Sequence, residues 1–489
     1  MAGGGVAGHG ASAGETKLPP LTPGPYRRRL GFVALVATFG GLLFGYDTSV
    51  INGAGGFMAR PDQLDLSPLG LGVAASALVY AAVIGAFTGG RISDAWGRKR
   101  TIAVLAVMFI IGVAVVSIAP SLAVVVVGRV VLGLAVGAAA VVVPVFLAEL
   151  APYEIRGSLA GRNEMMIVTG QLVAIIMNAI IGNVWGDQYP WVWRIMFALA
   201  AIPAILLLLG VSRMPESPRW LADKGRDDEA LEILESMRPP GRAKPELDDI
   251  IHTREIEKQR VSEDIGKIFH NKNLVRIILV GCGIGFFQQT TGINSILYYG
   301  SDVLEEAGFG TGGALIANIA PAAISVITAL IALQMMDRVS RRKTFLVGYA
   351  LVAFSHVLIG TADVVLPDGG AAKPYVLLIL IVFFVGSMQL FLNIATWVTL
   401  SEIFPQKIRA FGMGLAVAVL WMTNGFLTLF FPTIIAAIGI SGSFFAFAAL
   451  NVIAFFFFLK NVPETKGHTL EELEEHVTDG SIFHSIGRK

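Results

Sequence analysis

The sequence predicts an all-α integral membrane protein whose twelve transmembrane helices form two pseudo-symmetric six-helix bundles. Three observations predict this fold class: an apolar composition, twelve long apolar segments, and an internal repeat of short motifs. Of 489 residues, 54% are hydrophobic and 15% charged, whereas soluble domains carry about 25% charged residues. The formal net charge of +1 shows no basic excess, so we expect no nucleic-acid partner.

Each apolar segment is long enough to cross a lipid bilayer, which takes about 20 helical residues. In chain order the segments are 30–53, 68–90, 100–119, 121–148, 160–186, 191–212, 274–301, 311–336, 343–366, 373–401, 409–437 and 441–459. Arginines 27–29 precede the first segment as in a signal peptide, but that segment is too long and lacks a cleavage site. We therefore expect it to stay in the protein as a membrane helix.

Basic residues concentrate on alternate connections between the segments. The other connections carry little beyond Arg60 and Lys373. By the positive-inside rule, the basic connections and both chain termini face the cytoplasm. We predict five parts in chain order: a disordered cytoplasmic tail (1–29), an N-terminal bundle (30–212), a cytoplasmic helical linker (213–273), a C-terminal bundle (274–459) and a cytoplasmic tail (460–489).

Charged motifs recur in the two halves of the chain. The first-half members are Asp94, Arg98, Glu149, Arg156 and Glu216, and the second-half members are Asp337, Arg341, Glu402, Arg409 and Glu464. The intervals are 243 residues from Arg98 to Arg341, 253 from Glu149 to Glu402 and 248 from Glu216 to Glu464. A nearly constant interval predicts a duplicated bundle. We expect these charges to form salt-bridge networks between cytoplasmic helix ends that hold an outward-facing state.

Six motifs together carry a family resemblance: 90–99, 128–129, 149–157, 215–219, 288–294 and 463–467. From about residue 26 to 475 the chain resembles the sugar porter family of the major facilitator superfamily, and it is most similar to bacterial myo-inositol/proton symporters. The resemblance implies the major facilitator fold in the inner membrane of a bacterium. It also implies a substrate site near the membrane midplane, between the two halves.

Amide side chains lie near the middle of several predicted membrane helices: Gln171, Gln288, Gln289, Asn294 and Asn424. A buried amide in a membrane is costly and normally faces partners or a cavity. Amides both donate and accept hydrogen bonds, which suits a neutral polyhydroxylated ligand such as a polyol or sugar. The alternative is that these amides only join helices to one another.

The resemblance extends this set of candidate substrate-binding residues. Sugar porters bind substrate through residues that match Gln171, Gln288, Gln289, Asn294, Asn318 and Trp397, and Asn424 matches a position that some members use. Phe44 is a candidate for stacking on a ring, and Asn393 adds a polar group where the family often has glycine. Tyr298 and Tyr299 match an outer gate on the seventh helix.

One acidic and one basic residue lie at similar predicted depths in the membrane, Asp47 on the first helix and Arg129 on the fourth. Burial favours the protonated carboxyl, whereas a nearby guanidinium favours the carboxylate. Asp47 could therefore change protonation as Arg129 moves. The resemblance implies that this pair couples transport to a proton, and the alternative is a static structural ion pair.

These observations predict a proton-coupled importer of a neutral polyol or monosaccharide, with myo-inositol favoured and glucose or xylose possible. The open alternatives are a facilitative uniporter, a transporter-like nutrient sensor and a membrane enzyme; no catalytic motif supports the last. The single cysteine, Cys282, and seven scattered histidines provide no metal-ligand spacing. We expect no metal and no cofactor, and function as a monomer in the lipid bilayer.

Overall fold

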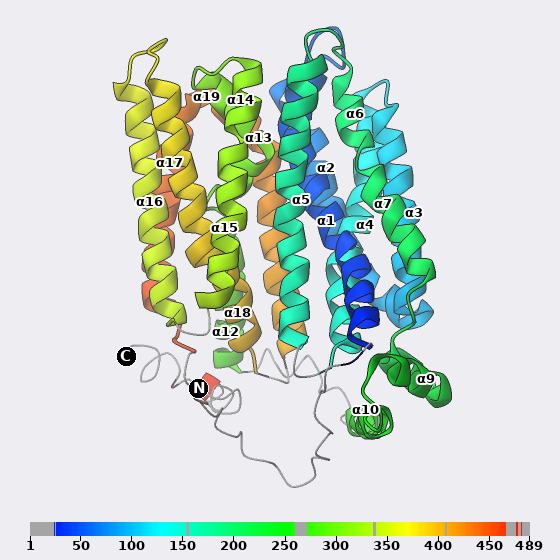
Figure 1. Ribbon diagram of the computed structural model, residues 1–489. Coiled ribbons are helices and arrows are strands. Elements are labelled where there is room, and N and C mark those ends of the chain that lie inside the picture. The colour runs from blue at the N-terminus through cyan, green and yellow to red at the C-terminus, as the bar shows by residue number, and fades with distance from the viewer. Residues whose placement is uncertain are drawn as a thin grey trace, which may run out of the picture.

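The computed structural model describes residues 24, 26–152, 156–259, 271–335, 339–405, 408–465, 476–477 and 481. These residues form two bundles of long helices that stand side by side, which confirms the predicted fold class (Figure 1). Most of the predicted tails 1–29 and 460–489 lies outside the described residues, as does 260–270 of the predicted linker.

The N-terminal half contains six membrane crossings. The bounds are α1 (Tyr26–Met58), α2 (Pro68–Trp96), α3 (Arg98–Ser117), α4 (Leu122–Leu150), α5 (Arg156–Trp185), α6 (Val192–Ala198) and α7 (Ala201–Ser212). The last two helices make one crossing, interrupted at Leu199 and Ala200. α1 begins inside the stretch assigned to the tail, because residues 26–29 contain no glycine or proline that would prevent a helix.

The C-terminal half also contains six crossings, and three of them are interrupted helices. The bounds are α12 (Lys272–Gln289), α13 (Ile293–Glu306), α14 (Thr311–Ala317), α15 (Ile319–Met335), α16 (Arg341–Val365), α17 (Lys373–Met388), the π-helical turn η2 (Gln389–Asn393), α18 (Ile394–Glu402) and α19 (Arg409–Asn461). α12 with α13, α14 with α15, and α17 with η2 and α18 each form one crossing.

α19 supplies the last two crossings, although it is one continuous helix of 53 residues by its hydrogen bonds. Gly439 has φ 69° and ψ −175°, a conformation outside the helical region that glycine adopts readily. The rings of Phe431 and Phe447 lie 6.1 Å apart, whereas 16 residues of straight helix would separate them by about 24 Å. The chain therefore reverses at Gly439, between the predicted segments 409–437 and 441–459.

Glycines allow close helix contacts inside and between the halves. A Cβ on Gly137 of α4 would lie 1.9 Å from the carbonyl oxygen of Ala82 on α2. A Cβ on Gly72 of α2 would lie 1.9 Å from the carbonyl oxygen of Leu429 on α19, across the two halves. Only a residue without a side chain permits such approaches, as is common between membrane helices.

Three short helices connect the halves at one end of the bundles: α8 (Pro218–Asp223), α9 (Asp227–Met237) and α10 (Ala243–Gln259) (Figure 1). We call this the linker end and the opposite one the far end. One face of α9 is apolar and is buried at Ala230, Leu234 and Met237. Arg238 donates to the carbonyl oxygen of Leu150 at 3.0 Å, so the linker is attached to the N-terminal half.

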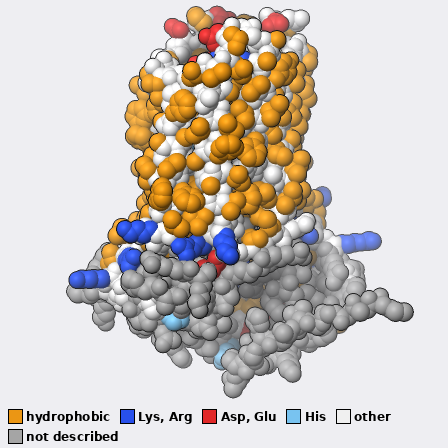
Figure 2. Space-filling model, turned by 90° about the vertical axis from the view of Figure 1, so that its left-hand side faces the viewer, with side chains coloured by type: hydrophobic (Ala, Val, Ile, Leu, Met, Phe, Trp, Pro, Cys, Tyr) orange, Lys and Arg blue, Asp and Glu red, His pale blue; other side chains and the backbone are white. Residues whose placement is uncertain are grey.

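On the face shown in Figure 2, hydrophobic side chains form a broad belt around the bundles. In that view, lysine and arginine side chains gather at the linker end of the belt, and acidic side chains lie at the far end. Eleven of the described helices are long and apolar enough to cross a membrane, the last of them being the doubled α19.

Candidate functional site

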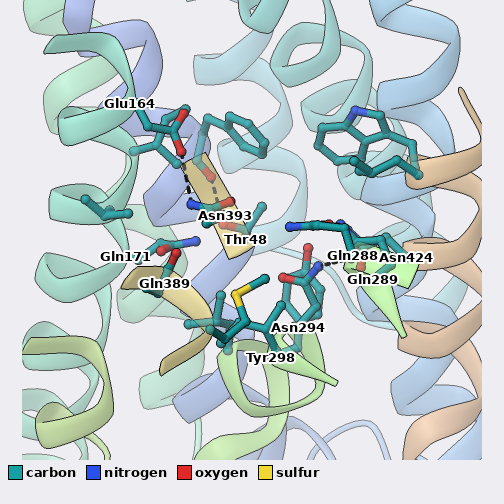
Figure 3. Close-up of a pocket in the computed structure, with 18 of the residues that line it drawn as sticks. Thr48, Glu164, Gln171, Gln288, Gln289, Asn294, Tyr298, Gln389, Asn393 and Asn424 are labelled. Carbon is teal, nitrogen blue, oxygen red and sulfur yellow. Dashed lines mark hydrogen bonds between the residues drawn. The ribbon is translucent and has the colours of Figure 1, made fainter. Parts of the chain in front are cut away.

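A cavity of about 130 Å³ lies between the two halves, and it is the candidate functional site. Its polar lining from the N-terminal half is Thr48, Glu164 and Gln171, and its polar lining from the C-terminal half is Gln288, Gln289, Asn294, Tyr298, Gln389, Asn393 and Asn424 (Figure 3). The remaining walls are apolar and aromatic. The cavity therefore combines many amide groups with hydrophobic surface.

The interruption between α12 and α13 brings three amides into this cavity. Gly292 has φ 80°, so α12 ends and α13 begins in a new direction. Gln288 and Gln289 close α12, and Asn294 opens α13. Asn294 donates to Gln289, whose own amide nitrogen donates to Gln288. The break therefore gathers amides that a straight helix would spread around its circumference.

Buried side chains satisfy the backbone carbonyls that this interruption leaves free. His356 is fully buried among the rings of Phe384, Phe444 and Phe447. Its Nε2 lies 2.8 Å from the carbonyl oxygen of Thr291. His356 thus supports the shape of the break.

Two amide oxygens at the cavity have no partner among the described residues, Gln171 Oε1 and Gln389 Oε1. Gln389 lies in η2, and its amide nitrogen donates to Ser325. A buried acceptor without a hydrogen bond costs free energy. These two oxygens are therefore available to accept hydrogen bonds from the hydroxyl groups of a ligand.

Glu164 is the acidic side chain in the described lining of the cavity, and it is not among the site residues predicted from the sequence. Asn393 of η2 donates to Glu164 Oε1 at 3.5 Å, across the two halves. Glu164 precedes Gln171 by seven residues, two helical turns, so both lie on one face of α5. An acidic residue inside a predicted membrane helix is itself a functional signal, and it could have identified Glu164.

The predicted substrate-binding residues line the cavity, with one exception. Phe44 and Trp421 line the cavity and stack on each other with ring centroids 5.6 Å apart, and Trp397 and Asn424 also line it. Asn318 lies outside the lining because its amide is buried against Asn52, to which it donates at 2.9 Å. The contact of the lining residues with a substrate stays a prediction.

The two predicted gate tyrosines lie on different sides of α13. Tyr298 lines the cavity, whereas the hydroxyl of Tyr299 donates to the carbonyl oxygen of Thr428 at 2.7 Å. The ring of Tyr299 stacks on Phe431 at 5.8 Å. Both tyrosines are buried, so α13 is packed against α19 at this point.

Asp47 and Arg129 are adjacent and fully buried, but the carboxylate oxygens of Asp47 make no hydrogen bond to Arg129. Arg129 donates to the backbone oxygens of Asp47, Ala74 and Ala75 at 2.9, 3.1 and 3.3 Å. Both carboxylate oxygens of Asp47 lack a hydrogen-bond partner among the described residues. The expected pair is therefore close in space but separated here, beside the cavity and outside its lining.

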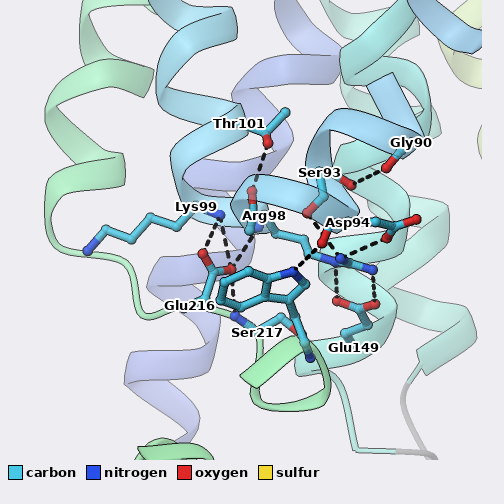
Figure 4. A network of polar contacts seen from close by, with 11 residues as sticks. Gly90, Ser93, Asp94, Arg98, Lys99, Thr101, Glu149, Glu216 and Ser217 are labelled. Atoms are coloured by element: carbon cyan, nitrogen blue, oxygen red, sulfur yellow. Dashed lines mark hydrogen bonds and ion pairs between the residues drawn. The ribbon is translucent and has the colours of Figure 1, made fainter. Parts of the chain in front are cut away.

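A charged network joins helix ends of the N-terminal half at the linker end (Figure 4). Arg98 binds both carboxylate oxygens of Glu149, each at 2.8 Å, and lies 2.9 Å from Asp94. Glu216 accepts from the backbone nitrogens of Arg98 and Lys99 at 2.9 and 3.1 Å. These contacts fasten α2, α3 and α4 to the start of the linker.

The C-terminal half has a matching network. Arg341 binds Glu402 at 3.1 Å, and the backbone nitrogen of Arg341 donates to Glu464 at 2.9 Å. Arg409 donates to the carbonyl oxygen of Phe404 at 3.2 Å. The side chains of two further predicted members, Arg156 and Asp337, lie outside the described residues. The described contacts of each network stay within one half.

Contacts between the halves concentrate at the far end. Asn183 of α5 donates to the carbonyl oxygen of Gly312 at 3.1 Å. A Cβ on Gly182 would lie 2.4 Å from a methyl carbon of Leu315, so α5 and α14 are in close contact. Asn52 makes four further hydrogen bonds across the halves at this end. The structure is therefore closed at the far end.

The family model described as "Sugar (and other) transporter" matches residues 33–477. The chain is 45% identical over 444 residues to the major myo-inositol transporter IolT of Bacillus subtilis (strain 168), which covers 91% of this chain and 93% of that protein. The inward open conformation of the xylose transporter XylE from E. coli superposes with a TM-score of 0.78 at 31% identity, covering 91% of this chain and 99% of that one.

A second structure, of the major facilitator superfamily proton:xylose symporter XylE bound to 6-bromo-6-deoxy-D-glucose, superposes with a TM-score of 0.72 at 30% identity. It covers 92% of this chain and 99% of that one. Of these two structures, the inward open one matches the described helices more closely.

Proposed function

This chain belongs to the sugar porter family of the major facilitator superfamily, and we propose that it imports a neutral polyol or monosaccharide by proton symport. Myo-inositol is the favoured substrate, with glucose or xylose as the next candidates. Transport proceeds by alternating access: the cavity opens first to one side of the membrane and then to the other. The transporter works as a monomer and catalyses no chemical reaction.

The observation that carries the proposal is the amide lining of the central cavity. Among the described lining residues there are seven amides and no lysine or arginine. An anionic substrate would need a basic partner, whereas hydroxyl groups need both donors and acceptors. The unpartnered oxygens of Gln171 and Gln389 add acceptors, and the stacked Phe44 and Trp421 offer an apolar surface to a ring.

Myo-inositol is favoured by similarity. The chain shares 45% identity with a myo-inositol transporter and 31% with a xylose transporter. A hexahydroxy ring has a donor and an acceptor at every carbon, which suits a cavity lined by amides on several sides. The carboxylate of Glu164 would accept hydrogen bonds from two neighbouring hydroxyls.

Proton coupling is supported by the position of Asp47. It is buried beside Arg129, and its carboxylate oxygens make no hydrogen bond to a described residue. Protonation removes the cost of an unpaired buried charge. We propose that Asp47 is protonated in this state and that it loses the proton when Arg129 turns toward its side chain.

The linker end is proposed to face the cytoplasm of a bacterium. Lysine and arginine side chains gather there, as the positive-inside rule requires. Closure at the far end, together with the closer match to inward open XylE, supports a cavity that is accessible from the cytoplasm. Both termini then also lie in the cytoplasm, and the membrane is the inner one.

The proposal is tested with purified protein in proteoliposomes and radiolabelled myo-inositol. With the outside more acidic than the inside by one pH unit, we expect accumulation of up to about tenfold if one proton is coupled. Without the gradient, uptake should stop at equilibrium. Competition by glucose, xylose and scyllo-inositol then ranks the substrates, and failure of every compound to compete would exclude this substrate class.

Asp47→Asn tests the coupling step. Because an amide cannot release a proton, the variant should exchange substrate across the membrane but reduce gradient-driven accumulation to the equilibrium level. Asp302→Asn is the matched control, since Asp302 lies in α13 beside a separate space at the far end. Full accumulation by Asp47→Asn would exclude Asp47 as the proton site. Binding without any transport in the unmodified protein would favour a sensor, and gradient-independent uptake a uniporter.

A further inference from the structure

Asn52 of α1 is a buried amide to which the proposed function assigns no role. Its exposed fraction is 1%, and it lies outside the lining of the central cavity. Its described hydrogen bonds all go to residues of the other half, on α13 and at the junction of α14 and α15. A side chain of α1 therefore depends on the C-terminal half for all of these bonds.

Asn52 binds α13 where that helix departs from helical geometry. Tyr299 has φ −134° and ψ 17°. In a regular helix, the Ser301 N–H would donate to the carbonyl oxygen of Leu297, four residues earlier. Here Asn52 Oδ1 accepts from the Ser301 N–H at 2.9 Å, and Asn52 Nδ2 donates to the Leu297 oxygen at 2.8 Å. The amide of Asn52 thus binds both the donor and the acceptor of one turn of α13, where the helix departs from regular geometry.

Two further contacts complete the hydrogen bonding of this amide. Asn52 Nδ2 also donates to the carbonyl oxygen of Ile296 at 3.0 Å, and Asn318 Nδ2 donates to Asn52 Oδ1 at 2.9 Å. A side-chain amide has two N–H donors and an oxygen with two lone pairs, so the capacity of Asn52 is fully used. Gly300 allows this packing, since a Cβ there would lie 2.5 Å from Asn318 Oδ1.

We propose that Asn52 is a positioning residue that makes the bend of α13 and the closure of the far end a single two-state change. When the halves separate at the far end, Asn52 must leave α13, because α1 and α13 belong to different halves. The Ser301 N–H and the Leu297 carbonyl are then free to bond to each other, which straightens α13. This inference rests on the proposed alternating access.

The bend determines where the two tyrosines of α13 lie. Tyr298 lines the cavity, and Tyr299, at the bend itself, is bonded to Thr428 of α19. Straightening α13 changes the direction of both side chains together. Asn52 therefore controls the tyrosines through the backbone of α13, without touching the substrate.

The test measures the distance between the halves at the far end by double electron–electron resonance in lipid nanodiscs. Spin labels go on Asp187→Cys, after α5, and Ala371→Cys, before α17, both exposed, in a Cys282→Ser background. The parent protein should show mainly the short distance. Asn52→Ala should raise the ratio of long to short distances about tenfold or more, since it removes four hydrogen bonds from the closed state.

Asn178→Ala is the matched control. Asn178 is an equally buried amide (1% exposed) that donates to the carbonyl oxygen of Val50, within its own half. It should leave the distance distribution unchanged. Asn318→Ala removes one of the four bonds and should give an intermediate shift.

Two outcomes would overturn the inference: an unchanged distance distribution in Asn52→Ala, or an equal shift in Asn178→Ala. The labelled proteins are checked first for monodispersity by size-exclusion chromatography, so that misfolding is recognised separately. The distance measurement needs no transported substrate. Failure of the proposed transport function and failure of this inference are therefore distinguishable.

Discussion

At the scale of single residues, the cavity differs from a purely amide-lined site by one carboxylate. Glu164 lies two turns from Gln171 on the same face of α5, and its nearest described polar partner is Asn393 in the other half. A carboxylate accepts hydrogen bonds more strongly than an amide, but it also repels anions. We therefore expect Glu164 to favour neutral, hydroxyl-rich ligands in two ways.

Glu164→Gln tests this role with nearly unchanged shape. Hydrogen bonds to a charged group contribute about 1.5–3 kcal/mol, so we expect the dissociation constant of the substrate to rise by roughly 10- to 100-fold. The measurement is isothermal titration calorimetry with myo-inositol.

Thr169→Val is the control for Glu164→Gln, because the Thr169 hydroxyl bonds within α5 to the Met165 carbonyl oxygen and is absent from the cavity lining. It should bind normally. An affinity of Glu164→Gln within twofold of the parent value would show that the carboxylate does not contact the substrate.

At the scale of elements, the cavity is built at interruptions of helices. The break at Gly292 collects the amides of α12 and α13, and the π-helical turn η2 contributes Gln389 and Asn393. Such irregular turns are frequent at functional sites. Two buried side chains bind backbone carbonyl oxygens at the break between α12 and α13. His356 Nε2 lies 2.8 Å from the Thr291 oxygen, and Asn451 donates to the Thr290 oxygen at 3.4 Å.

Gly292→Ala should damage this element. Gly292 has a φ of 80°, and a residue with a Cβ is less stable in that conformation by roughly 1–2 kcal/mol. The added Cβ would also lie 3.0 Å from the ring of Phe447. We expect a lower melting temperature in detergent and weaker substrate binding. Gly414→Ala in α19 is the control, because nothing lies within 4 Å of the added Cβ there and alanine favours a helix. Equal stability of both variants would contradict this account.

At the scale of the whole molecule, the described contacts distinguish two kinds of connection. The networks of Arg98 and Arg341 stay within one half, so each can move as a unit with its own helices. The hydrogen bonds of Asn52 and Asn183 cross between the halves at the far end. A rocking motion of the halves would break the hydrogen bonds between the halves and keep the charged networks within each half.

A disulfide across the far end should stop that motion. In the Cys282→Ser background, Gly182→Cys with Leu315→Cys places two thiols where α5 and α14 already touch. We expect oxidation to abolish uptake in proteoliposomes and dithiothreitol to restore it. Each single cysteine variant, treated with the same oxidant, serves as the control. Full uptake by the cross-linked protein would show that the far end does not need to open.

Much of the fold was predictable because membrane helices are long and apolar. The twelve segments, the duplicated charges at Arg98 and Arg341 and the reversal near Gly439 all follow local patterns. The site was predictable in part. Amides such as Gln288 are conspicuous in an apolar helix. Gln389, by contrast, lines the cavity because it lies in a π-helical turn, and no local sequence pattern predicted that turn. Asn318 was expected in the lining, but its amide is used by Asn52.

The sequence by itself determined which segments enter the membrane and which side chains are too polar to face lipid, because transfer into hydrocarbon depends on each residue's own chemistry. Only the tertiary structure decided which of those polar groups meet. It left the carboxyl group of Asp47 unpaired, although Arg129 binds the backbone oxygen of Asp47, and it joined Asn52 to a bent α13. Hydrogen bonds form over about 3 Å, and positions hundreds of residues apart reach that distance only through the packing of both halves.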